Sequence, residues 1–306
     1  LAVAGSGNVL LDAAGALALN ADILGSVSGN ITLVGGNGLS IASGVSTITG
    51  AGDIFMDAGI GALLQSSTST TAAGENVRLV ATGDVTVAEV IADKISVLSS
   101  ANIITAPGAS LNLSASALRL DAGQAIGTGT DPLTLSVSEL SALANTGGIF
   151  LSESDDITVS SVEVTTDKVG ADATTTPIAD SALSDLQSGS NGSIVLSAGG
   201  SITLDDGDTD GSVVNAAGSG NILLDAAGAL ALNADVSSGS GNITLIGTSG
   251  VSLASSVTAQ TAGTGTIDVS SLEGGLTMAT DSSITALDGD VVVETSEDVL
   301  VAGITT

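Results

Sequence analysis

The sequence contains no cysteine, histidine, tryptophan or tyrosine, and phenylalanine occurs only twice among its 306 residues. Without cysteine the chain has no disulfides, so its stability must come from non-covalent contacts such as backbone hydrogen-bond ladders. Bulky aromatic side chains suit a thin, repetitive core poorly. Their scarcity also removes the aromatic platforms on which carbohydrate-active enzymes bind sugar rings.

Basic side chains are almost absent. Arg78, Lys94, Arg119 and Lys168 stand against 33 acidic residues, which gives a formal net charge of −29. Nucleic acid is therefore excluded as a partner, because affinity for it rests on Lys and Arg, and docking on anionic membranes is disfavoured for the same reason. The sequence contains no run of 18 uncharged apolar residues, so it predicts no membrane-spanning helix. The composition suits a soluble, self-repelling chain in salty surroundings rich in divalent cations.

Two pairs of carboxylates raise the question of catalysis: Glu153 with Asp155, and Asp205 with Asp206. Two carboxylates can perform general acid–base chemistry without histidine, so a polysaccharide-active β-helix enzyme is a minor alternative. A solvated acidic face explains each pair more simply. We therefore predict that the chain is not an enzyme.

One strip of sequence is written twice. GSGNVLLDAAGALALNAD, residues 5–22, returns at 218–235 with a single change, and the similarity continues until residues 1–93 have recurred as 214–306. Self-similarity at a fixed period is typical of an array, here with a super-repeat of about 213 residues. The alternative is a recent duplication of one domain. Because the chain starts and stops inside a repeat, we expect it to be a segment of a longer protein.

A shorter period runs inside the long one and starts at Asn8, Asn30, Asp53 and Asn76. Each of these residues precedes an apolar–x–apolar pair, and Gly, Ser, Asn and Asp separate the pairs, which is typical of short strands and turns. The sequence thus predicts an all-β parallel β-helix, or β-solenoid, with coils of about 21–24 residues, running as one continuous domain through 1–306. Asn at the coil corner can hydrogen-bond along the stack, whereas a column of Asp would repel itself.

The alternation also predicts which side chains face outward. Leu33 is expected in the core and Thr32 on the surface, where Asp should be tolerated. Phe55 and Phe150 are expected to point outward between inward aliphatic residues, either for lateral contacts or beneath a covering segment.

One stretch, 165–192, breaks the rhythm and is too long and polar for a corner. Thr176 can cap a helix and Pro177 suits its first turn, so the sequence predicts a loop or short helix extruded from one coil. Residues 137–144 are a weaker helix candidate, and a strand is favoured there.

The sharpest local motif lies in LDDGDTDGS, residues 204–212. Its D-x-D-x-D-G spacing resembles the opening of a calcium loop, in which alternate carboxylates wrap a hard cation. The sequence therefore predicts a possible Ca²⁺ site at Asp205, Asp206, Asp208 and Asp210. The glutamate expected at the twelfth loop position is missing, because Ala217 stands there, and a plain surface turn is the alternative.

Motifs such as GNITLVGGNGLSIAS, the wealth of Gly, Ala and Ser, the acidic pI and the lack of cysteine resemble the repeat regions of filamentous-haemagglutinin-like adhesins and other giant bacterial surface proteins. The resemblance covers nearly the whole chain. It implies a right-handed parallel β-helix, an extracellular or cell-surface location, and a structural or adhesive stalk whose partners are adjacent repeats and a host or matrix polysaccharide or protein. A subunit of a self-assembling filament is the alternative. The coils here are longer than that family's, and we expect no secretion domain within residues 1–306.

Overall fold

The computed structural model describes residues 1–25 and 27–306 and divides the chain into two compact units. Unit 1 comprises Leu1–Gly123, Asp131–Val137 and Val162–Ala182, and unit 2 comprises Gln124–Thr130, Ser138–Ser161 and Leu183–Thr306. Together the units contain about 13 turns of stacked parallel strands, so the predicted all-β solenoid is confirmed. No helix occurs among the described residues, and hence none that could cross a membrane. The sequence predicted one continuous solenoid through 1–306, and each of the two units contains stacked parallel strands.

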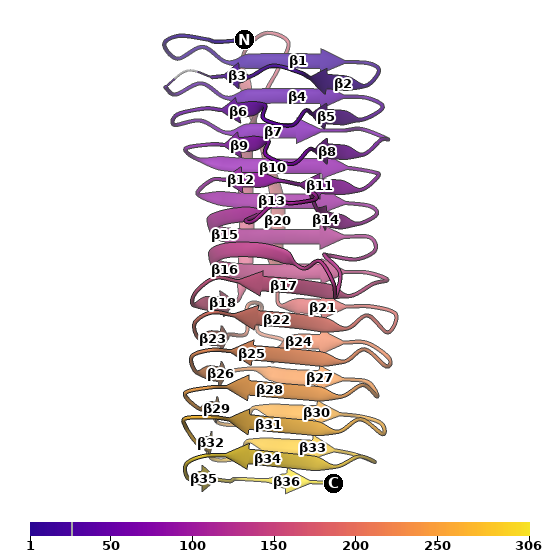
Figure 1. Cartoon of the computed structure of the whole chain (residues 1–306), viewed down its shortest axis with the longest axis vertical. Coiled ribbons are helices and arrows are strands. Elements are labelled where there is room, and N and C mark those ends of the chain that lie inside the picture. The colour runs from indigo at the N-terminus through magenta and orange to yellow at the C-terminus, as the bar shows by residue number, and fades with distance from the viewer. Residues whose placement is uncertain (26) are drawn as a thin grey trace. The chain divides into compact units, whose positions relative to one another are not determined.

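Unit 1 stacks its strands in three parallel ladders (Figure 1). The first ladder contains β1 (Val9–Ala13), β4 (Ile31–Gly35), β7 (Ile54–Asp57), β10 (Asn76–Ala81), β13 (Lys94–Ser99) and β15 (Leu113–Ala122). The second contains β2 (Leu17–Leu19), β5 (Leu39–Ile41), β8 (Leu63–Gln65), β11 (Val85–Val87) and β14 (Ile103–Thr105). The third contains β3 (Ile23–Leu24), β6 (Ser46–Ile48), β9 (Thr70–Ala72) and β12 (Glu89–Ile91), and it ends on the first residues of β15.

Unit 2 repeats this arrangement. Its first ladder contains β17 (Ile149–Glu153), β22 (Ile194–Ala198), β25 (Ile222–Ala226), β28 (Ile243–Gly247), β31 (Ile267–Ser271) and β34 (Val291–Thr295). Its second contains β18 (Ile157–Val159), β23 (Ile202–Leu204), β26 (Leu230–Leu232), β29 (Val251–Leu253), β32 (Leu276–Met278) and β35 (Val299–Leu300). Its third contains the end of β16 (Leu133–Ala144), then β21 (Leu186–Ser188), β24 (Ser212–Ala216), β27 (Asp235–Ser238), β30 (Thr258–Thr261), β33 (Ser283–Ala286) and β36 (Ile304–Thr305).

The core consists of aliphatic columns, as the alternation predicts. Ile31 pairs with Val9 on one side and Ile54 on the other, and this column continues coil by coil. Leu33 and Met56 are fully buried beside it. Burying such side chains is worth about 1.5–3 kcal/mol each, so a coil that is too thin for a layered core is still held firmly to its neighbours.

The two copies of the duplicated strip fold alike, into β1 and β2 in unit 1 and into β25 and β26 in unit 2, and each leads into the next strand, β3 or β27. Both copies are followed by a glycine in the same unusual conformation, with φ of 129° at Gly38 and 135° at Gly250. A side chain is strained at such an angle, so the turns that lead into β5 and β29, in the coil after each copy, both need glycine.

The predicted corner column is present as a ladder of side chains. The Asn8 Oδ1 atom accepts a hydrogen bond from the backbone N–H of Asn30 (2.9 Å), and the Asn30 Oδ1 atom accepts one from the N–H of Asp53 (2.8 Å). Asp53 in turn accepts from the N–H of Asn76 (2.8 Å). The same ladder recurs in unit 2, where Asn221 accepts from Asn242 (2.8 Å).

Coil length varies more than the sequence predicted. Val77 pairs with Ile95, only eighteen residues later, and Ile194 pairs with Ile222, twenty-eight residues later. Only the inward-facing strand residues must match between neighbouring coils, so the extra or missing residues lie in the turns between the strands.

The extrusion predicted at 165–192 as a loop or short helix is neither. It folds as a two-stranded β-hairpin of β19 (Ser161–Val169) and β20 (Thr175–Ser184). The backbone turns between the Gly170 N–H and the Thr174 carbonyl (2.8 Å). Alternating side chains in SVEVTTDKV give β19 the strand period. Its pairing with β20 holds the segment of Thr176 and Pro177 as a strand in spite of the capping signal. The strand favoured over a helix at 137–144 is confirmed within β16.

Candidate functional site

A row of outward side chains in unit 1 carries chemistry that is rare elsewhere in the chain. We call it the seat column; register pairing places its members one above another, and they are Leu10, Thr32, Phe55, Arg78, Ser96 and Arg119. Outward residues of a solenoid normally meet solvent. Here Thr32 and Ser96 are fully buried, and Phe55 is 3% exposed.

The cover is the hairpin, whose residues 162–182 we call the strap. In Figure 1 its pink ribbons run across the ladder strands of unit 1, instead of along them. At one end Val162 and Val164 pack on Ala117 of β15. At the other end the Asn8 Nδ2 atom donates to the carbonyl of Ala173 (3.1 Å). The strap therefore spans the six stacked strands from β1 to β15.

Between these ends the strap is hydrogen-bonded to coil after coil. The Asn76 Nδ2 atom donates to the Thr165 carbonyl (2.9 Å), and the Val169 N–H donates to the Thr32 hydroxyl (2.8 Å). The Arg119 Nε atom donates to the carbonyl of Ser181 (3.1 Å). The expectation that Thr32 lies on the open surface is thus wrong, because a segment distant in sequence lies over it.

The strongest contact of the strap is a two-pronged ion pair. The Arg78 Nε and Nη2 atoms each donate to one oxygen of Asp180 at 2.8 Å, and the two side chains are 13% and 5% exposed. The Arg78 guanidinium lies 5.3 Å from the Phe55 ring centre, and the Lys168 ammonium lies 5.0 Å from it. Both distances are within the range of cation–π attraction.

Asp53 is the one acidic member of the corner ladder in unit 1, and the strap explains it. Its Oδ1 atom accepts the ladder bond from the Asn76 N–H, and its Oδ2 atom accepts a second bond from the Asp167 N–H (2.6 Å). Asparagine would place an NH₂ donor where Oδ2 lies and could not accept that second bond there. Burial raises the pKa of Asp53, backbone hydrogen bonds oppose that shift, and the charges of Asp167 and Glu75 add to it.

The sequence predicted that Phe55 and Phe150 point outward, with cover by the extruded segment as one option for such residues. For Phe55 that option is what the structure shows. Phe150 is half-buried between the inward residues Ile149 and Leu151. What sequence reasoning missed is that Arg78, Arg119 and Lys168, three of the four basic residues, gather at the strap and its seat column.

The second candidate is the acidic loop of unit 2, residues 205–211, where the sequence predicted calcium ligands. Asp206 turns its carboxylate inward on the loop, accepting from the backbone N–H groups of Asp208 (3.1 Å), Thr209 (2.7 Å) and Gly211 (3.0 Å). Burial acts to raise the pKa of Asp206, but these backbone donors together lower it. Asp205 instead accepts from the Asn233 Nδ2 atom (2.7 Å).

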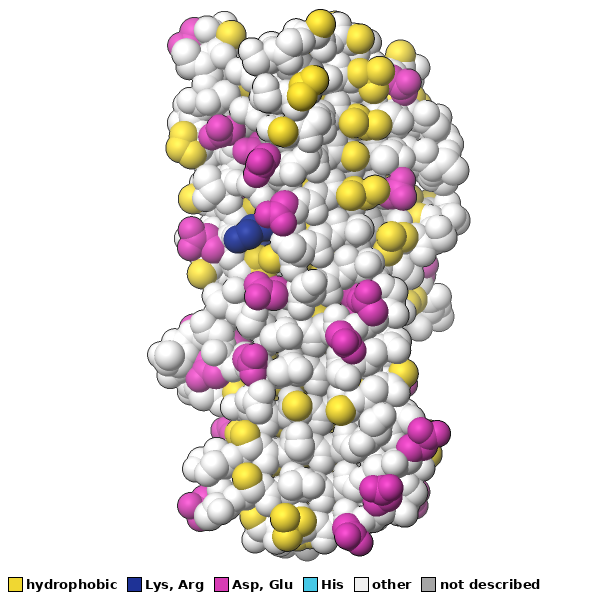
Figure 2. Space-filling view, turned by 90° about the vertical axis from the view of Figure 1, so that its left-hand side faces the viewer, with side chains coloured by type: hydrophobic (Ala, Val, Ile, Leu, Met, Phe, Trp, Pro, Cys, Tyr) yellow, Lys and Arg dark blue, Asp and Glu magenta, His cyan; other side chains and the backbone are white. Residues whose placement is uncertain are grey.

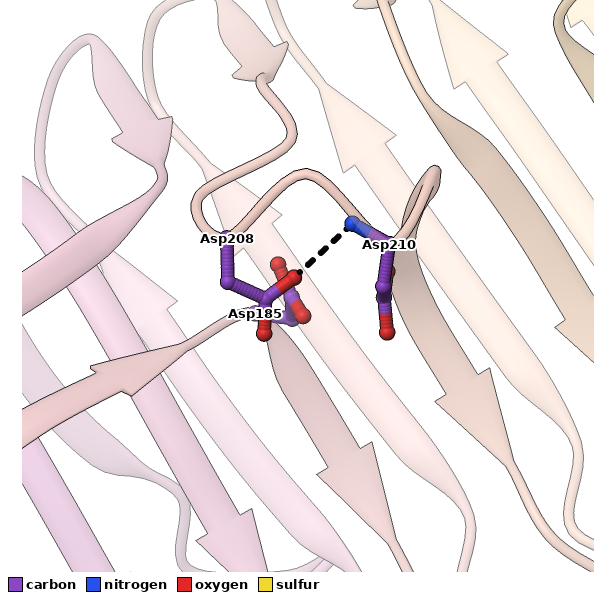
Figure 3. Close-up of side chains that lie close together, drawn as sticks. All are labelled: Asp185, Asp208 and Asp210. Carbon is purple, nitrogen blue, oxygen red and sulfur yellow. Dashed lines mark hydrogen bonds between the residues drawn. The ribbon is translucent and has the colours of Figure 1, made fainter.

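The other two predicted ligands lie together, with a third residue that the sequence did not indicate. One carboxylate oxygen each from Asp185, Asp208 and Asp210 lies within 4.8 Å of the others (Figure 3). Asp185 precedes β21, one coil earlier, and is 1% exposed. Burial and the charges of Asp208 and Asp210 raise its pKa to about 6. Finding it from sequence requires knowing the coil offset that pairs Leu186 with Val214.

The carboxylate pairs considered for catalysis have local structural contacts. The Glu153 Oε1 atom accepts from the Ser154 N–H (2.7 Å) and is buried, and Asp205 holds Asn233 in the next coil. A surface hollow in unit 1 is lined mostly by small side chains, such as Ser69 and Ala109, and Glu89 is the one charged residue in its lining. On the face drawn in Figure 2, acidic side chains are scattered instead of gathered into one patch.

Comparison with known proteins adds nothing to these observations: no family model, no curated protein and no solved structure matches the chain.

Proposed function

We propose that the chain is a non-enzymatic, extracellular structural segment, a stalk of stacked coils that carries or displays adhesive surfaces. The observation that carries the proposal is the strap, which ties six stacked strands of unit 1 together from β1 to β15. In a solenoid each coil contacts only its neighbours, so an end coil can detach by itself. A strap across many coils suppresses that detachment, which is useful in a part that bears load.

The use of scarce residues supports this role. The chain places the Arg78–Asp180 ion pair and one of its two phenylalanines under the strap, where they hold coils together. The extracellular setting is supported by the high acidic charge, by the absence of cysteine and by the resemblance to giant bacterial surface proteins.

Single-molecule stretching between the two chain ends tests the structural role. Release of one coil of about 22 residues lengthens the chain by roughly 75 Å, so coil-by-coil extension can be counted. We expect unit 1 to resist a higher force in the wild type than in Asp180→Ala. Glu163→Ala is the matched control, because it removes one acidic side chain from the exposed side of the same strap. Extension without measurable resistance would contradict the proposal.

Two further measurements test the remaining parts. Antibodies against the chain should label intact cells of the natural producer, and labelling only after permeabilisation would overturn the extracellular location. Incubation with a panel of acidic and neutral polysaccharides should release no new chain ends; cleavage that Glu153→Gln abolishes would favour the enzyme instead. Rods that lengthen with concentration would favour the self-assembling filament over a single-chain stalk.

A further inference from the structure

Next to the acidic loop lies a buried carboxyl, that of Asp185, beside which the described residues of unit 2 place no basic side chain. The Asp185 carboxyl is 1% exposed, and its Oδ1 atom is buried without a hydrogen-bond partner. The rest of the carboxyl receives a long contact at Oδ2 from the Gln187 Nε2 atom (3.4 Å) and a backbone hydrogen bond from Gly207. A buried carboxylate with an unpaired oxygen is strongly unfavourable unless a counter-charge lies against it.

No side chain of unit 2 can supply that counter-charge. All four basic residues of the chain, Arg78, Lys94, Arg119 and Lys168, belong to unit 1, and the sequence has no histidine. The two groups that do lie beside Asp185 are the carboxylates of Asp208 and Asp210, which are exposed and add negative charge. A cation bound between the three carboxylates would neutralise this charge.

The geometry fits one ion. Two oxygens bound to the same Ca²⁺ at about 2.4 Å are at most about 4.8 Å apart, and one oxygen from each of the three carboxylates lies within 4.8 Å of the others. An all-oxygen donor set suits calcium or magnesium and not zinc, which prefers nitrogen and sulfur. Figure 3 shows the three carboxyl groups collected beneath the loop that precedes β24.

We propose that Asp185, Asp208 and Asp210 bind a single Ca²⁺ ion, which joins the coil of β21 to the loop that leads into β24. This site differs from the one that the D-x-D-x-D-G spacing predicts. Asp206 organises the loop through its backbone contacts, Asp205 holds Asn233, and the buried ligand comes from the preceding coil. Backbone carbonyls and water complete the coordination of such an ion.

Calcium titration of the full chain by isothermal calorimetry, after chelator treatment, tests the site. We expect one calcium ion to bind per chain, with a dissociation constant of roughly 0.1–1 mM as in extracellular calcium modules, and magnesium to bind more weakly. Asp185→Asn should weaken calcium binding at least about tenfold. Asp205→Asn should leave it unchanged, as should Asp288→Asn, which removes an exposed charge elsewhere in unit 2.

Thermal unfolding separates a ligand from a structural residue. Calcium should raise the melting temperature of the wild type by mass action, and Asp185→Asn should abolish that rise. In chelator, Asp185→Asn should melt at or above the wild type, because it removes an unpaired buried charge. No calcium binding by the wild type at millimolar concentration, or full binding by Asp185→Asn, would overturn the site; loss of binding in Asp205→Asn would restore the loop predicted from sequence.

Discussion

Removal of the Asp180 carboxylate should release the strap from unit 1. In Asp180→Ala the Arg78 guanidinium stays beneath the strap, 13% exposed, without its two-pronged partner. Breaking one side of a buried ion pair in this way costs about 3–5 kcal/mol. The strap can escape the penalty by detaching, because Arg78 then regains water, so the penalty falls on the docked state of the strap.

A penalty of about 3 kcal/mol raises the detached population roughly 100-fold. Trypsin can measure it, because Lys168 lies in the strap and is held against Phe55, whereas the other three cleavage sites lie in ladder strands. When opening and closing are faster than cleavage, the cleavage rate follows the detached population. We expect fragments 1–168 and 169–306 to form roughly 100-fold faster in Asp180→Ala than in the wild type.

Glu163→Ala is the control, since Glu163 is exposed on the same hairpin and removing it should leave the rate within about twofold, the effect of an ordinary surface substitution. Cleavage of Asp180→Ala at the wild-type rate would show that the ion pair does not hold the strap. Equal acceleration in both variants would show that loss of charge, and not loss of the Arg78 contact, is responsible.

Three more perturbations test the same structure. Phe55→Ala should destabilise unit 1 by about 3 kcal/mol and expose Lys168 to trypsin, whereas Phe150→Ala, at a half-buried position, should cost less by thermal unfolding; equal losses would mean that the strap does not shelter Phe55. Leu33→Asp and Thr32→Asp should both be severely destabilising, because both side chains are fully buried, and tolerance of Thr32→Asp would show that the strap is open in solution. The folded state raises the pKa of Asp53 above its ordinary 3.8, so stability is lost as the pH rises from about 4 through that raised pKa. The melting temperature of the wild type should therefore fall more over this pH range than that of Asp53→Asn. Parallel curves of melting temperature against pH for the two proteins would contradict the assignment.

The sequence predicts the coil but not what lies over it. Period-two alternation correctly separates the inward Leu33 from the outward Thr32, since strand geometry fixes which side each residue faces. Exposure of the outward side depends on a contact with Val169, more than a hundred residues away in the chain. No local pattern encodes such a contact, although an arginine and a phenylalanine stacked on an outward face are an unusual pairing in so polar a chain.

The acidic loop shows the same limit. Spacing alone identifies Asp208 and Asp210, but it gives Asp206 the same role. The motif cannot tell a carboxylate with one oxygen engaged by the backbone, as in Asp208 and Asp210, from one with both oxygens engaged, as in Asp206. Asp185 is joined to the loop only by the stacking of coils, and the coil here is longer than the regular period predicted.

The corner ladder has a direction. In each step the side chain of the earlier residue accepts from the backbone N–H of the later one, from Asn8 through Asn30 to Asp53, and again from Asn221 to Asn242. A damaged corner is therefore felt on one side only: Asn30→Ala would orphan the N–H of Asp53 but leave its own N–H bonded to Asn8. The side-chain ladder therefore gives the stack a chemical polarity, because loss of one corner side chain unpairs a backbone N–H only in the next coil toward the C-terminus.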